Sequence, residues 1–126
     1  YFGTYAERVV LAVLLENTEK KTVIDNFPQI LKDLLAVYPN LSLKLSPKLA
    51  DQTQFTYIKT AQALNISATI VDEAKAHSPY GLIVHSNQAE NLDKVLFSEL
   101  YPDILAPSET EPILEKKGFF AKLFGK

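Results

Sequence analysis

The chain has 126 residues, of which 47% are hydrophobic and 22% are charged, a composition typical of one soluble domain with a buried core. It contains no cysteine, which excludes disulfides, thiolate metal sites and thiol nucleophiles and favours a reducing cytoplasm. Four of the 13 basic groups are Lys116, Lys117, Lys122 and Lys126, so the rest of the chain holds 9 basic against 15 acidic groups, a net charge of −6, which disfavours nucleic acid as a partner.

The first predicted element is the apolar run Val9–Leu15, which is too short to cross a membrane. Its three valines and its continuous apolar character are typical of a strand buried on both faces. Thr4 and Glu7 have capping-box spacing, which would begin a helix here instead. The strand is the favoured interpretation.

A helix is predicted next, because apolar residues recur at spacings of three and four. They draw one apolar stripe: Ile24, Phe27, Ile30, Leu31, Leu34, Leu35 and Tyr38. Proline fits only the first turn of a helix, so Pro28 predicts a start capped by Asp25 or Asn26. Pro39 ends the helix, since the residue before a proline avoids helical geometry.

The segment after Pro39 alternates leucines with polar residues from Leu41 to Leu45, which predicts a strand with one solvent-facing side. A second helix is predicted over residues 54–64, capped by Asp51 or Thr53. Its apolar side would consist of Phe55, Ile58, Ala61 and Leu64.

Asn65 suits the left-handed position that follows a helix, and Ile66–Val71 is a predicted third strand. Gly81–Val84 is the fourth. A third helix is expected over Asn87–Leu100, because residues 87 and 90 have capping-box spacing and four apolar residues follow. Pro102 would end it.

Three regions are predicted from the change in composition after residue 101. Residues 1–101 form a single domain and residues 102–117 a linker rich in proline and acidic groups. Residues 118–126 form a basic, aromatic tail in which Phe119, Phe120, Leu123 and Phe124 would share one side of a helix, with lysines such as Lys122 around the rest.

The sequence Tyr1–Leu11 resembles the YueI-like family of Gram-positive bacteria, and Tyr57–Ala61, Ala68–Val71 and Tyr80–Val84 extend the resemblance. It implies an α/β fold in which a mixed four-stranded sheet in β-α-β-α-β-β order has an antiparallel last strand, helices packed on it, and a C-terminal helix and tail. This is similar to the chorismate-mutase-like architecture. The family has no known function, and a fold shared with enzymes and RNA binders establishes neither activity.

No catalytic site, metal or cofactor is predicted. The four glycines are scattered, and His85 and Ser86 are neighbours on a strand that point to opposite faces. Asp72, Glu73 and His77 have metal-ligand chemistry in one loop, for which a solvated polar loop is the favoured interpretation.

The candidate ligand or partner contacts are Glu7, Arg8, Tyr57, Lys59 and His85. An arginine can hold an anionic group, whereas the alternative is a surface ion pair and a helix cap. The tyrosine and lysine would lie on the second helix, where an aromatic side chain usually packs in the core.

The leading functional expectation is a non-enzymatic interaction or adaptor domain of the cytoplasm. Its tail would engage an anionic membrane surface or a protein partner, with packing of the tail onto its own domain as the alternative. Two other functions stay open. One is RNA binding by fold similarity, and the other is a small-molecule site or active site between subunits.

Overall fold

The computed structural model describes residues 6–72 and 78–105. The elements in chain order are η1 (Ala6–Arg8), β1 (Val9–Leu14), α1 (Leu15–Thr18), α2 (Lys21–Val37), β2 (Leu41–Leu45), α3 (Asp51–Ala63), β3 (Ser67–Ile70), β4 (Tyr80–Ser86), α4 (Phe97–Leu100) and α5 (Pro102–Leu105).

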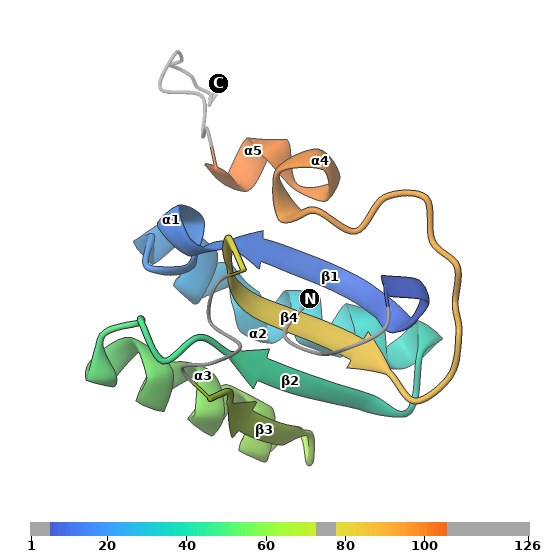
Figure 1. Cartoon of the computed structure of the whole chain (residues 1–126), viewed down its shortest axis with the longest axis horizontal. Helices are drawn as coiled ribbons and strands as arrows, with labels where there is room; N and C mark the ends of the chain where they lie inside the picture. The colour runs from blue at the N-terminus through green and yellow to red at the C-terminus, as the bar shows by residue number, and fades with distance from the viewer. Residues whose placement is uncertain (1–5, 73–77, 106–126) are drawn as a thin grey trace, which may run out of the picture.

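The four strands form one mixed sheet in the order β1-β4-β2-β3 (Figure 1). The last strand, β4, is antiparallel to both β1 and β2, while β2 and β3 are parallel. The expected fold class is therefore confirmed, and so is the assignment of the first apolar run to a strand rather than a helix.

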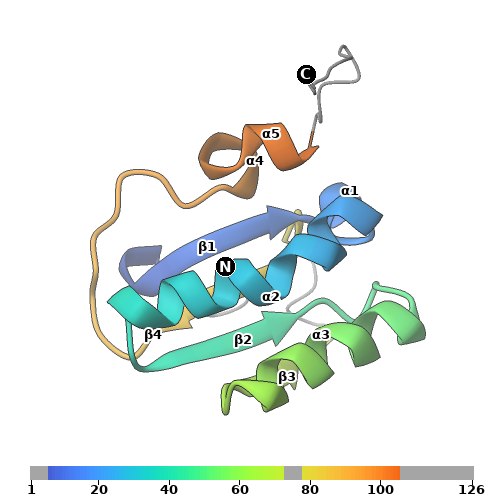
Figure 2. The same ribbon diagram turned by 180° about the vertical axis from the view of Figure 1, so that it is seen from behind.

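Helices α2 and α3 lie side by side on one face of the sheet (Figure 2). The main core fills the space between these helices and the strands. The leucines of β2 point into this core, because they alternate along the strand with polar residues that point to the other face. Phe27 of α2 and Tyr57 of α3 meet edge to face in this core, with 5.0 Å between ring centroids.

A second, smaller apolar cluster lies on the opposite face of the sheet. It consists of Val9, Ala12, Val71 and Ile83. The short helices α4 and α5 lie beside β1, at the edge of the sheet (Figure 1). The backbone of the segment that precedes α4 covers the free edge of β1, since the Ala12 amide donates to the Val95 carbonyl at 2.7 Å.

The predicted start of the first long helix at Asp25 or Asn26 is wrong. Helix α2 begins at Lys21 and keeps Pro28 in its interior. The early turn is held by burial of Val23 and by the amides of residues 23 and 24, which both donate to the Lys20 carbonyl. Tertiary packing of this turn outweighs the local cost of the proline.

The predicted cap of α3 is wrong, and its predicted apolar side is wrong at Phe55 alone, because Ala61 is in the core and Ile58 and Leu64 pack against it. The helix has no side-chain cap of its own. The carboxylate of Glu19 accepts a hydrogen bond from the Ala50 amide at 2.8 Å and another from the Thr53 hydroxyl. The buried side is formed by Thr53, Tyr57 and Ala61, so Phe55 points outward and is 55% exposed.

The predicted helix over residues 87–100 is reduced to α4 at its C-terminal end. Residues 87–96 instead run outside the sheet from β4 to α4 (Figure 1). The amides of Glu90 and Asn91 donate to the Glu7 carbonyl at 2.7 and 3.0 Å, so long-range backbone bonds replace helical ones. Residues 102–105, at the start of the predicted linker, form α5.

Candidate functional site

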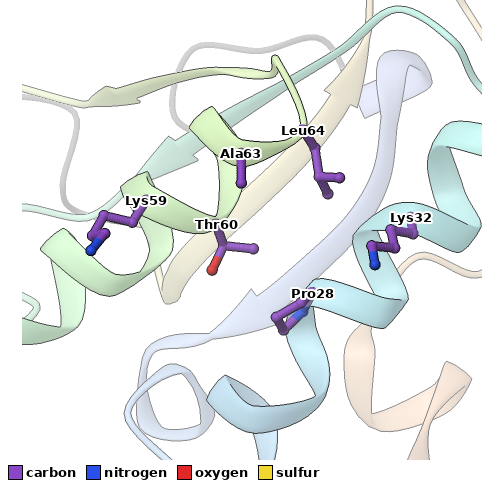
Figure 3. A pocket seen from close by; sticks show the side chains of 6 residues that line it. All are labelled: Pro28, Lys32, Lys59, Thr60, Ala63 and Leu64. Carbon is purple, nitrogen blue, oxygen red and sulfur yellow. The ribbon is translucent and has the colours of Figure 1, made fainter.

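A shallow groove of about 350 Å³ runs between α2 and α3 on the outer surface of the helical layer (Figure 3). It is lined by residues of both helices and of the cap of α3: Pro28, Lys32, Lys59, Thr60, Ala63 and Leu64. The edge-to-face contact of Phe27 and Tyr57 fixes the distance between the two helices. The groove thus lies between two helices that are joined by a contact in the core.

Pro28 breaks a local rule of helix structure at this groove. It lies in the interior of α2 and has no amide hydrogen, so the Ile24 carbonyl cannot receive the usual bond from four residues later. Positions where a sequence departs from local preference are often functional or strained. The proline ring, Ala63 and Leu64 provide the apolar part of the lining.

Two lysines stand on opposite sides of the groove, Lys32 on α2 and Lys59 on α3 (Figure 3). Within residues 6–72 and 78–105, neither forms an ion pair within 4.0 Å. The nearest sequence neighbour with a negative charge on α2, Asp33, accepts a hydrogen bond from Gln29 at 2.9 Å. Lys59 lies over the ring of Phe55, 5.4 Å from its centroid. The groove therefore has an apolar lining with one basic side chain from each helix, and the ammonium group of Lys59 is directed away from the other lining residues (Figure 3).

Tyr57, one of the predicted contacts, lies in the core with only 1% of its surface exposed. Its hydroxyl donates to the Thr18 carbonyl at 2.7 Å, and burial together with the charge of Glu19 raises the pKa of this phenol. Its place in the core gives it a packing role, and it supports the groove from below. Lys59 is the predicted contact that lines the groove.

Two further predicted contacts, Arg8 and His85, lie on the other side of the molecule. His85 is in β4, paired with Val9 of β1 and Ser42 of β2, and Arg8 directly precedes β1. Both are separated from the groove by the sheet. The contact that the structure gives for Glu7 is made by its backbone carbonyl, which accepts hydrogen bonds from two amides of the segment after β4.

Some predicted residues fall outside the described part of the chain. These are Glu73, His77 and the whole tail with Phe119, Phe120, Lys122, Leu123 and Phe124. Among the described residues there is no group of three or more histidine or acidic side chains that could hold a metal ion.

The sequence gives no direct sign that Lys32 belongs with Lys59. They meet at the groove only because two helices pack side by side on the sheet, and the pairing of helices is not encoded in a local pattern. Pro28 inside a helical stripe was the visible signal, but it was interpreted as a helix start.

The profile of the family described as "Protein of unknown function (DUF1694)" matches residues 1–96 of the chain. A solved structure, described as that of the YueI protein from Bacillus subtilis, is similar to this fold with a TM-score of 0.65 and 24% sequence identity. The similarity covers 76% of this chain and 72% of that one. The comparison with curated proteins gives no match.

In the described segments, no helix is both long and apolar enough to span a bilayer.

Proposed function

The chain belongs to the DUF1694 family of proteins of unknown function, and from that premise we propose that it is a non-enzymatic binding domain whose groove between α2 and α3 holds a small organic anion. The observation that carries this proposal is the position of Lys32 and Lys59 on opposite sides of an apolar lining.

The groove selects a ligand by two complementary features. The ammonium group of Lys32, and that of Lys59 once its side chain turns from Phe55 into the groove, attract a carboxylate, sulfonate or phosphate, while Pro28, Ala63 and Leu64 favour an apolar body. Its volume of about 350 Å³ is at the small end of the range for ligand pockets, roughly 300–1,000 Å³. We therefore expect a small molecule rather than a polyanion.

The polar groups of the groove favour binding over catalysis. Apart from the two lysines, the lining offers the hydroxyl of Thr60, which already donates to the Thr56 carbonyl at 3.1 Å. A nucleophile needs a general base within hydrogen-bond reach, and the lining contains no such pair. Two lysines are also too few to follow a nucleic acid backbone.

An interaction role for residues 118–126 is a second candidate function, and it rests on the sequence. Phe119, Phe120, Leu123 and Phe124 are spaced to share one side of a helix, and four lysines flank them. An adaptor that binds a small anion on its folded domain and a membrane or a protein through its tail would combine both candidates.

The proposal is tested with two fluorescent naphthalene dyes. Anilinonaphthalene sulfonate carries one negative charge, and N-phenyl-1-naphthylamine is its uncharged relative. In the double variant Lys32→Gln/Lys59→Gln, we expect sulfonate binding to weaken about fivefold, since each exposed charge contributes roughly 0.5 kcal/mol. Binding of the neutral dye should not change. Both are measured by fluorescence titration at low ionic strength.

The matched control is Lys20→Gln/Lys48→Gln, which removes the same net charge from exposed positions outside the groove. Ala63→Leu fills the groove at an exposed helical position and should weaken both dyes. Equal effects of the two lysine pairs on the sulfonate dye would contradict the proposal, as would full binding of both dyes to Ala63→Leu.

A further inference from the structure

The two edges of the sheet differ in how they are covered. At one edge, β1 is bonded to the segment before α4 through Ala12 and Val95, and register shifts interrupt its pairing with β4. At the other edge, β3 pairs with β2 in four successive positions without a shift, and among the described residues no strand lies on its outer side (Figure 1). An edge strand of this kind is a template for a further strand.

The backbone of β3 has groups that point to this open edge. The Val71 amide donates to the Leu45 carbonyl at 3.0 Å, so the backbone groups of residue 71 point toward β2. Successive residues of a strand direct their amides and carbonyls to opposite sides. Thr69 therefore also bonds toward β2, whereas Ala68 and Ile70 direct their amides and carbonyls outward. These two residues can each form hydrogen bonds with a further strand.

The side chains of this edge carry no charge. Residues 66–71 contain neither a charged residue nor proline, the features that usually keep edge strands apart. Elsewhere the chain is acidic, with 9 basic against 15 acidic groups outside the last four lysines, so two copies repel each other over most of their surface. Ile70 is paired with Leu45 of the main core and points to the same face, yet it is 41% exposed. The edge is thus a place where a second copy can approach without opposing like charges.

We propose that β3 pairs antiparallel with β3 of a second copy about a twofold axis at Thr69, which joins the two sheets into one. In this register, Ala68 of each copy lies opposite Ile70 of the other, and each such pair exchanges backbone hydrogen bonds. The small side chain of Ala68 leaves room for Ile70 beside it. Thr69 lies opposite its own counterpart, and threonine pairs across strands are favourable.

A second copy fits this edge better than a foreign strand does. The outward-pointing residues of β3 are Ala68 and Ile70 alone, and the register centred between them uses both residues of both copies. A twofold axis makes the two halves of the contact identical, so every small side chain meets a large one. None of these residues lines the groove between α2 and α3, so the inference does not depend on the proposed function.

The first test uses a single cysteine, because the chain contains none. In Thr69→Cys, the two thiols would face each other in a pair whose Cα atoms lie about 4.5 Å apart, within the range of a disulfide. Ser67→Cys is the matched control, since it is also exposed and on the same face but would lie roughly 13 Å from its counterpart along the paired strands. In a glutathione redox buffer, we expect Thr69→Cys to cross-link about tenfold faster or more, measured on non-reducing gels.

The second test measures the dimer itself by sedimentation velocity at micromolar concentrations and low ionic strength. We expect the parent chain to dimerise. Thr69→Lys would place two like charges opposite each other and should weaken the dimer about fivefold, whereas Ser67→Lys adds the same charge away from its counterpart and should dimerise like the parent.

A parent chain that stays monomeric would overturn the proposal and leave the edge to a strand of another protein. Equal rates of cross-linking at positions 67 and 69 would overturn it as well, as would equal dimer affinities of the two lysine variants.

Discussion

At the scale of single residues, Gly81 determines how closely β4 passes α1. A Cβ atom built there would lie 2.9 Å from Thr18 Cβ, 3.1 Å from Leu15 Cα and still closer to the Thr18 hydroxyl. Thr18 cannot easily move away. Its hydroxyl donates to the Leu14 carbonyl at 2.8 Å, and its carbonyl accepts the bond from Tyr57. Glycine is required at this position by space.

We predict that Gly81→Ala lowers the free energy of unfolding by about 2–3 kcal/mol, the usual cost of overpacking a core. Urea denaturation followed by circular dichroism measures it. Ser67→Ala, at an exposed position of β3, is the control and should change stability by less than about 0.5 kcal/mol. A Gly81→Ala protein as stable as the parent would show that α1 and β4 are not packed as described.

Residue roles set by neighbours in sequence could be predicted, while those set by distant residues could not. Asn65 is expected in the left-handed region and has a φ of 61°. The cap of α3 was assigned to that helix itself, but its acceptor is Glu19, whose carboxylate is 31 residues away from Ala50 in the chain. No local sequence pattern predicts a contact between residues so far apart in the chain.

At the scale of elements, strands were predicted from two patterns, a continuous apolar run for β1 and an alternation with a period of two for β2. The alternation of β2, with its three leucines facing the core, matches the predicted pattern residue by residue. The segment 87–96 has helix-like spacing but forms backbone bonds to Glu7 and Ala12 instead. There, pairing with the edge of the sheet outweighs helical propensity.

The proline inside α2 leads to a prediction about this helix. Pro28→Ala restores an amide that can donate to the Ile24 carbonyl, and alanine is favourable in a helix interior. We expect the free energy of unfolding to rise by about 2 kcal/mol, somewhat less than the full penalty of an interior proline because proline also restricts the unfolded chain.

Thermal and urea unfolding of Pro28→Ala would be compared with Gln29→Ala, an exposed neighbour on the same helix. Destabilisation by Pro28→Ala would contradict this prediction, because it would show that the proline ring stabilises the fold by packing.

At the scale of the whole molecule, the sequence predicts a tail that acts apart from the domain. Among the described residues, the core extends to Ile104 and Leu105, which pack against its edge. We therefore predict that deleting residues 118–126 leaves the unfolding midpoint unchanged and abolishes association with anionic vesicles or with a protein partner. Circular dichroism and vesicle co-sedimentation measure the two effects.

In a second variant, the four apolar residues of the tail are replaced by serine while its lysines are kept. This variant distinguishes the contribution of the apolar side chains to association from that of the lysine charges. Unfolding of the domain on deletion would contradict an interaction role, because the tail would then be part of the core. Retained association of the truncated chain would also contradict it.

The order of most strands and helices was predictable from periodicity, whereas the mixed sheet and its antiparallel last strand were implied by the resemblance to a family. The candidate sites were predictable only in part. Lys59 was identified singly, whereas Lys32 joins it at the groove through helix packing. That relation exists only in the folded chain.

The most direct test of the central claim is to locate the bound sulfonate dye on the protein. Nuclear Overhauser effects between its ring protons and methyl groups would be recorded on the complex. The account predicts contacts with the methyl groups of Thr60, Ala63 and Leu64, which line the groove on its α3 side. Contacts confined to the sheet face or to the residues of the core, with none to these three methyl-bearing residues, would contradict it.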